Sequence, residues 1–288
     1  MQKTKYLSIE SRRVGLFSNV LHTIDQLIYC EKNNIYPIID WGRVEGSFLY
    51  KDEEYEKENG IKNCWEYFFE RINSKKIEDL CINDECRVVR DFNNPSFVPF
   101  CFRGIYKFGK IDIPTFSEKR KEIGEFIKNK IVVKKEIMSK INNFYDNNFK
   151  NYNVVSIHIR GTDRFTETTN LQLSNLENYL DILNKIQSKY DKIFVCSDSD
   201  ESIKFLNEHY DNVVFYDSYR SSKHDSNPIH FSNGNYRTGE DVLIESILMS
   251  KTNHIILSDS NVTLMSLYYN SMIDFTYYEY EFLSRGKK

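Results

Sequence analysis

The chain has 288 residues, of which 40% are hydrophobic and 15% aromatic, and its formal net charge is −3. This length suits one large domain or two ordinary ones. A net charge so close to zero gives no sign of the basic face that nucleic-acid binding requires, so we expect no nucleic-acid partner. The sequence lacks a signal-peptide pattern and any apolar run of ~20 residues, and its six cysteines form no CxxC pair. These features are typical of a cytoplasmic protein with free thiols.

The first half begins with a predicted strand at 6–9 and a loop, followed by a helix whose apolar positions recur from Phe17 to Ile28. A second strand is predicted at 35–40, and this strand–helix–strand order favours parallel pairing. Residues 45–60 are charged and irregular, which indicates an exposed loop. No period holds over 62–115, whereas the Lys/Glu-rich stretch 117–149 predicts one or two amphipathic helices. A polar cluster near 148–152 suggests domains at 1–150 and 151–288.

The second half alternates regularly between predicted strands and helices. The strands lie at 154–159, 193–196, 213–216 and 254–257. Helices are predicted between them and at the end of the chain, and Ser174 with Glu177 forms a capping box before the first of these helices. Repeated strand–helix alternation predicts a doubly wound parallel sheet.

Polar side chains lie at or just after the carboxyl ends of three of these predicted strands. They are His158, Arg160, Asp163 and Arg164 after the first, Ser197 and Asp198 after the second, and Ser258, Ser260 and Asn261 after the fourth. In open parallel sheets, ligands bind outside the carboxyl ends of the strands. The third group also begins a helix, whose N–H groups and dipole favour phosphate, and the arginines offer charge-assisted bonds to the same anion. This combination suits a diphosphate.

Several of these residues have a second interpretation. His158 alternates with apolar residues, so it is equally well explained as a packed strand histidine. Asp198-Ser-Asp200 matches an Asp-x-Asp metal motif, but Ser199 and Asp200 also suit a helix cap. The group at 258–261 also fits a simple helix cap. Glu245 lies in an apolar helix, where an unpaired carboxylate is costly, so it requires a partner or a ligand. No G-x-G-x-x-G follows a predicted strand, which disfavours a nicotinamide-dependent oxidoreductase.

Three segments resemble the signatures of the α1,6-fucosyltransferase and protein O-fucosyltransferase superfamily, and they occur in the family's order. They are His158-Ile-Arg-Gly-Thr-Asp-Arg164, Ile193-Phe-Val-Cys-Ser-Asp198, and the stretch from Asp241 to Val262. Gly15-Leu-Phe-Ser-Asn19 and Ile38-Ile-Asp-Trp41 are similar to the family's N-terminal region. Gly161 departs from the pattern, because the α1,6 subgroup has a second arginine there, and this leaves the linkage open.

The resemblance implies a GT-B-like α/β fold, with two Rossmann-like domains facing across a cleft. Residues 1–150 would form the acceptor-side domain and residues 151–288 the nucleotide-sugar-binding domain. The implied donor is GDP-fucose or a related nucleotide sugar, and the implied acceptor is a glycan or lipid-linked glycan, which leaves peripheral membrane association open. The reaction would invert the anomeric carbon and use neither a metal nor another cofactor.

The resemblance also assigns roles to residues by position. Arg160 is expected to contact the β-phosphate, and Glu167 is expected to act on the acceptor, an alignment that needs a small gap. The expected nucleotide contacts are His158, Asp163, Arg164, Ser197, Asp198, Glu245, Ser258, Ser260 and Asn261. Two alternatives stay open: a glycosyltransferase of the same fold with another donor, and a nucleotide- or glycan-binding protein without catalytic activity.

Overall fold

The computed structural model of the chain describes residues 4–81, 84–89, 106–107, 110–111, 113–159, 176–221, 233–257 and 260–277. The chain divides into two compact units, and each unit contains two segments of sequence. The first comprises Met1–Met138 and Gly234–Leu243, and the second comprises Ser139–Asn233 and Ile244–Lys288. The chain passes between the units within α4 (Lys135–Asn148), again between Asn233 and Gly234, and a third time within α9 (Tyr236–Ser250).

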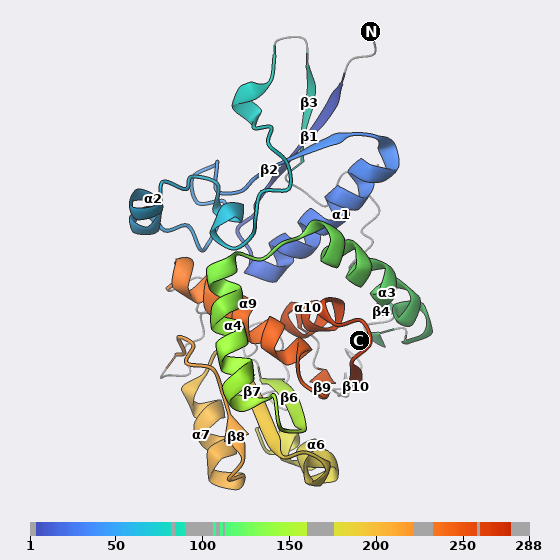
Figure 1. Ribbon diagram of the computed structural model, residues 1–288, viewed down its shortest axis with the longest axis vertical. Helices are drawn as coiled ribbons and strands as arrows, with labels where there is room; N and C mark the ends of the chain where they lie inside the picture. The colour runs from blue at the N-terminus through green and yellow to red at the C-terminus, as the bar shows by residue number, and fades with distance from the viewer. Residues whose placement is uncertain are drawn as a thin grey trace, which may run out of the picture. The chain divides into compact units, whose positions relative to one another are not determined.

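The first unit contains a parallel sheet with the strand order β2-β1-β3 (Figure 1). Its strands are β1 (Lys5–Glu10), β2 (Tyr36–Asp40) and β3 (Glu85–Val89), and α1 (Leu16–Asn33) connects the first two. Leu27 and Cys30 of α1 pack on Leu7 and Ile9 of β1. The predicted strand–helix–strand segment with parallel pairing is therefore confirmed. β3 lies in the stretch where no sequence period was visible.

The prediction of an irregular exposed loop at 45–60 is wrong, because α2 (Glu53–Asn59) forms within it. Asp52 caps this helix, since its Oδ1 accepts hydrogen bonds from two backbone N–H groups of the first turn at 3.1 and 3.0 Å. Gly60 ends the helix with a left-handed backbone. Phe48 and Tyr50 of the same stretch are buried. The remaining elements of the unit are η1 (Cys64–Tyr67), η2 (Ile77–Asp79), the antiparallel pair β4 (Tyr106–Lys107) and β5 (Lys110–Ile111), and α3 (Ile113–Lys130).

The second unit contains a five-stranded sheet in which every neighbouring pair is parallel. The strand order is β10-β9-β6-β7-β8, so the chain moves outward in one direction from β6 and then returns to the other side of it. This arrangement confirms the predicted doubly wound sheet, although β10 was not predicted. The elements are β6 (Val154–Ile159), α6 (Glu177–Ile186), η4 (Gln187–Lys189), β7 (Lys192–Ser197), α7 (Asp200–His209), β8 (Val213–Val214), β9 (His254–Leu257), α10 (Asn261–Tyr269) and β10 (Asp274–Tyr277).

Both faces of the second sheet are covered, which explains the continuous apolar runs at residues 193–196 in β7 and 255–257 in β9. On one face, residues of β6 and β7 form a buried core with α6 and α7, to which the helices contribute Tyr179, Leu183, Ile203 and Leu206. On the other face, Phe194 of β7 lies 5.7 and 5.0 Å from the rings of Phe144 and Phe149, at the end of α4. Ser174, the first residue of the predicted capping box, lies outside the described residues.

The Lys/Glu-rich stretch forms α3 and α4, as predicted. Ile123, Ile127 and Ile137 are buried, whereas the charged residues between them face outward. The apolar faces of these helices are thus narrow, as is usual for helices that pack on a core. Among the described residues, no helix combines the length and the apolar character needed to cross a membrane.

Candidate functional site

The strand order of the second sheet reverses at β6, with β7 on one side and β9 on the other. In doubly wound sheets, such a reversal opens a crevice at the carboxyl ends of the strands, and ligands bind there. His158 lies near the carboxyl end of β6, Ser197 ends β7, and Ser260 follows β9. The fold therefore brings three of the predicted site residues to one edge of the sheet.

The ends of β6 and β7 are held by backbone pairing and a short turn. His158 pairs in register with Cys196, and both side chains are buried. The Ser197 hydroxyl accepts a hydrogen bond from the backbone N–H of Ser199 at 3.1 Å, which turns the chain from β7 towards α7. Asp198 lies in this turn, and its side chain is only partly buried. The turn thus presents a partly accessible carboxylate at the edge of the sheet.

Ser260 is the N-cap of α10. Its backbone is extended, and its hydroxyl accepts a hydrogen bond from the N–H of Val262 at 3.2 Å. Asn261 begins the helix and is partly buried. The cap interpretation of this residue group is correct for Ser260, and it is compatible with anion binding, because the dipole of the same helix end favours negative charge.

Glu245 lies on α9, and its carboxylate is held by two side chains of the segment after β8. Ser218 Oγ donates to Glu245 Oε1 at 2.7 Å, and Arg220 Nη2 lies 3.2 Å from the same oxygen. The side chains of Arg220 and Glu245 are only 5% and 7% exposed. The requirement for a partner was visible in the sequence, whereas its identity was not. The carboxylate expected at the nucleotide therefore has two protein partners.

Five of the predicted site residues lie outside the described residues. They are Arg160, Asp163, Arg164, Glu167 and Ser258. Their expected roles rest on the sequence alone.

The Asp-x-Asp motif lies at the start of α7. Asp200 is the first residue of the helix and is exposed, and Ser199 precedes it with an extended backbone. Of the residues that the structure describes, no three or more His, Cys, Asp or Glu are grouped as metal ligands. Ser199 thus occupies the N-cap position of α7, as the second interpretation proposed, but its side chain makes no cap hydrogen bond.

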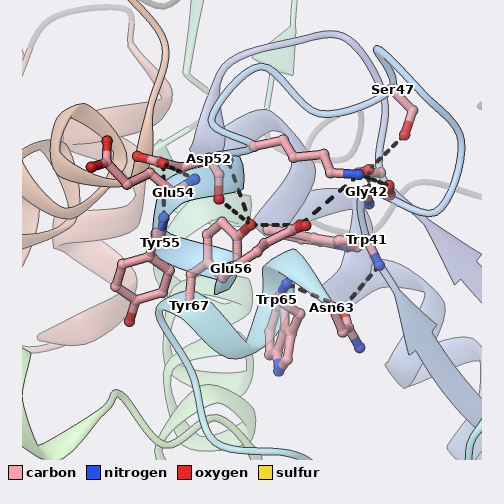
Figure 2. Close-up of polar contacts among 12 residues, drawn as sticks. Trp41, Gly42, Ser47, Asp52, Glu54, Tyr55, Glu56, Asn63, Trp65 and Tyr67 are labelled. Atoms are coloured by element: carbon pink, nitrogen blue, oxygen red, sulfur yellow. Dashed lines mark hydrogen bonds and ion pairs between the residues drawn. The ribbon is translucent and has the colours of Figure 1, made fainter. Parts of the chain in front are cut away.

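The loop that follows β2 in the first unit is fixed by side-chain hydrogen bonds to its backbone (Figure 2). Asn63 Oδ1 accepts from the N–H of Trp41 at 3.0 Å, and its Nδ2 donates to a carbonyl of β2 at 2.7 Å. Ser11, which follows β1, accepts from the N–H of Gly42 at 2.9 Å, and its hydroxyl lies 3.3 Å from that of Ser47. The carboxyl-end loops of these two strands are therefore tied to each other.

Asp52 joins α2 to the beginning of α9 within the same unit. One of its carboxylate oxygens caps α2, and the other accepts from the N–H of Tyr236 at 3.2 Å. The ring of Tyr236 stacks on that of Tyr55 with 3.8 Å between centroids. These contacts explain why residues 234–243 belong to the first unit. No pattern in the sequence indicated that residues 234–243 pack with the first unit.

The turn between β1 and α1 is held by Asn19, the last residue of the segment that resembles the family's N-terminal region. Asn19 Oδ1 accepts from the N–H of Arg12 at 2.8 Å, and Nδ2 donates to the carbonyls of Arg12 and Val14 at 3.0 and 3.2 Å. One turn further along α1, His22 is fully buried. Burial and the nearby charge of Arg12 lower the pKa of His22 to about 3, so the imidazole is neutral at physiological pH.

The fold of the whole chain is similar to solved structures of fucosyltransferases. Fucosyltransferase NodZ from Bradyrhizobium is 17% identical, with 92% of each chain covered and a TM-score of 0.53. NodZ α-1,6-fucosyltransferase soaked with GDP-fucose is 16% identical, with 92% of each chain covered and a TM-score of 0.54. POFUT1 in complex with GDP is 10% identical, with 96% of this chain and 99% of the other covered and a TM-score of 0.52. No family model and no curated protein matches the sequence. The chain thus has the GT-B-like α/β fold of these fucosyltransferases, as the sequence predicted.

Proposed function

We propose that this chain is an inverting, metal-independent glycosyltransferase that transfers fucose from GDP-fucose to a hydroxyl group of a glycan or lipid-linked glycan. In this proposal residues 151–288 carry the nucleotide sugar and residues 1–150 form the acceptor side, bounds that differ from the two compact units at residues 139–150 and 234–243. The observation that carries the proposal is the shared fold, which spans more than nine-tenths of both chains in a NodZ structure soaked with GDP-fucose and in POFUT1 with GDP. The polar edge of the second sheet at its point of strand reversal supports the same conclusion.

In the proposed reaction, the acceptor oxygen attacks the anomeric carbon of fucose, and the bond from that carbon to the β-phosphate oxygen breaks. Negative charge grows on the departing diphosphate, where Arg160 offers a bidentate fork of donors. Ser260 and the first turn of α10 add N–H groups and the positive end of a helix dipole. Glu167 accepts the proton of the attacking hydroxyl group.

The other proposed donor-site residues surround this diphosphate position or the nucleoside. At the ends of β6 and β7 they are His158, Ser197 and Asp198. At the beginning of the last helix they include Asn261. Asp163, Arg164 and Ser258 complete the set on sequence grounds. Glu245 reaches the site indirectly, through the protein partners described above.

The test is a panel of GDP-, UDP- and CMP-sugars, incubated with the purified protein while nucleotide release is measured. We expect release of GDP from GDP-fucose, unchanged by EDTA, and selective thermal stabilisation by GDP. Arg160→Lys should lower the rate by ~10²–10³, because a point charge does not replace the planar fork. Near-normal turnover by this variant would reject the role of Arg160, and no release from any donor would reject the enzymatic function.

A second candidate is a transferase of the same fold that uses another nucleotide sugar. One observation favours it: the carboxylate of Glu245, which the resemblance assigns to the nucleotide, is already held by Ser218 and Arg220. Stabilisation and turnover with UDP- or CMP-sugars, in the absence of either with GDP-fucose, would select this candidate.

A further inference from the structure

The buried pair of Arg220 and Glu245 bonds a loop to itself as well as to a helix. Arg220 Nη2 donates to the carbonyl of Tyr216 at 2.6 Å, and Nη1 donates to the carbonyl of Ser218 at 3.1 Å. The same guanidinium lies 3.2 Å from Glu245 Oε1, which also accepts from Ser218 Oγ at 2.7 Å. Two side chains of the segment 216–220 thus converge on one carboxylate, and the guanidinium also bonds two carbonyls of the same segment. A different geometry of this segment would leave a buried charge without its partners, which is costly.

The segment bridges two attachments to β7. β8 pairs with β7 only through Val213 and Val214. The chain then leaves the ladder and pairs at Ser221 with the turn that follows β7: the N–H of Ser221 donates to the carbonyl of Asp198 at 2.9 Å, and its carbonyl accepts from the N–H of Asp200 at 3.0 Å. Arg220 immediately precedes this second attachment. The ion pair therefore fixes the length and path of the chain that reaches the backbone of Asp198.

Glu245 also contacts β7 close to the carboxyl end of that strand. Its backbone carbonyl lies 3.8 Å from Sγ of Cys196, which is the register partner of His158. Burial raises the pKa of the Cys196 thiol, and the charge of Glu245 raises it further while that of Arg220 opposes this effect. The pair thus lies directly beside the β6 and β7 ends that the proposed function assigns to the donor.

From these contacts we infer that Arg220 and Glu245 are positioning residues, which hold the segment 215–221 against the end of β7 and so set the backbone of Asp198 in the donor site. The inference rests on the proposed function for its link to the nucleotide. The link to the backbone of Asp198 is independent of that function.

Four variants separate positioning from simple stability. Glu245→Gln removes one charge and leaves Arg220 buried, so its Tm should fall on the order of 10 °C. Arg220→Met combined with Glu245→Met removes both charges, and apolar replacement of a buried pair commonly preserves or raises stability. Arg220→Lys keeps the positive charge but loses the planar set of guanidinium N–H donors. Lys204→Met is the control, because it breaks an exposed pair with Glu208 in the same unit.

The first readout is hydrogen exchange, which needs no ligand. In the double methionine variant, the amides of Ser221 and Asp200 should exchange at least tenfold faster than in the wild type, whereas those within β6 should not change. The control should exchange like the wild type. Unchanged exchange at Ser221 and Asp200 in a stable double variant would overturn the positioning role.

The second readout is GDP affinity, together with KM and kcat for donor turnover. The double variant should bind GDP roughly tenfold more weakly, with the loss mainly in the donor KM, while its Tm stays near the wild-type value. Arg220→Lys should be intermediate. Faster exchange with unaltered GDP affinity would overturn the link to the donor. If the wild type binds no GDP, the proposed function fails and that link fails with it, whereas the exchange result still decides the positioning role.

Discussion

Replacing Gly42 with alanine should destabilise the first unit more than the same change at Gly46. Both glycines lie in the loop after β2 and have left-handed backbones, with φ of 77° and 71°. A methyl group at Gly42 would overlap with Sγ of Cys64, which is fully buried, whereas nothing lies within 4 Å of one at Gly46. The two variants therefore share backbone strain, and only one of them adds a steric overlap.

The expected magnitudes follow from these two causes. A left-handed backbone costs a non-glycine residue roughly 1–2 kcal/mol, so Gly46→Ala should lose about that much. Overpacking of a rigid site adds roughly 1–3 kcal/mol, so Gly42→Ala should lose roughly 2–5 kcal/mol in free energy of unfolding. Removing Sγ with Cys64→Ala relieves the overlap, because Cβ of Cys64 is 3.4 Å from the new methyl group. The two changes together should then cost about 1–3 kcal/mol less than their sum.

Intrinsic fluorescence during urea unfolding measures this directly. The chain has two tryptophans, and Trp41 and Trp65 both lie in the first unit, with ring centroids 5.0 Å apart and next to this loop. Gly60→Ala is a further control for backbone strain, since φ is 67° and nothing lies within 4 Å. Equal losses for Gly42→Ala and Gly46→Ala, or strict additivity of Gly42→Ala with Cys64→Ala, would refute the steric argument.

Three further predictions concern the same unit. Asp52→Ala should lower the free energy of unfolding by about 1–2 kcal/mol and speed amide exchange in the first turn of α9, because it removes the cap of α2 and an acceptor for that turn. A thiol reagent should label Cys81, which is exposed, and spare native Cys30 and Cys64, whose pKa values burial raises to about 12; mass spectrometry of the labelled protein decides this. The pKa of His22 is about 3 in the folded protein, compared with an ordinary value of 6.5. Between these two pH values the unfolded chain binds more protons than the folded one, so the free energy of unfolding should fall as the pH drops from 6.5 towards 3. Unfolding titrations should show a shallower fall for His22→Gln, and identical pH profiles would contradict the assignment.

The strands of the second sheet could be predicted because the sheet is covered on both faces. A strand buried on both sides is largely apolar at successive positions, as residues 193–196 and 255–257 are, and this signal survives without knowledge of the neighbours. β10 carries no such run, since Asp274 and Thr276 alternate with aromatic residues, and it is recognisable only from its pairing with β9. α2 was missed for a related reason. It has no buried residue, so its sequence shows no apolar period, and only its end signals, Asp52 at the start and Gly60 after the last turn, indicate a helix.

The candidate residues at the edge of the second sheet could be predicted from the sequence, whereas the buried ion pair beside them could not. Strand ends and a helix start are local features, and they identified His158, Ser197 and Ser260 correctly as neighbours of one sheet edge. The partner of Glu245 lies 25 residues earlier in a polar loop, and nothing local distinguishes Arg220 from other loop arginines. The burial of a carboxylate in an apolar helix predicted that a partner exists. Only the fold shows which residue it is.

The support of this edge is ionic rather than apolar, and this choice has a physical consequence. Two methionine side chains in place of Arg220 and Glu245 would fill the volume and tolerate sliding of the segment 215–221, because apolar contact has no preferred direction. The guanidinium, in contrast, bonds a carboxylate and two carbonyls at fixed angles, so a shift of about 1 Å breaks a bond whose buried groups then stay unsatisfied. Because burying two charges is costly, the pair adds little net stability to the fold. It does, however, make the energy rise sharply when the segment moves from its position. The donor site proposed above, which has to hold hydrogen-bond donors near a departing diphosphate, would depend more on this fixed position than on added stability.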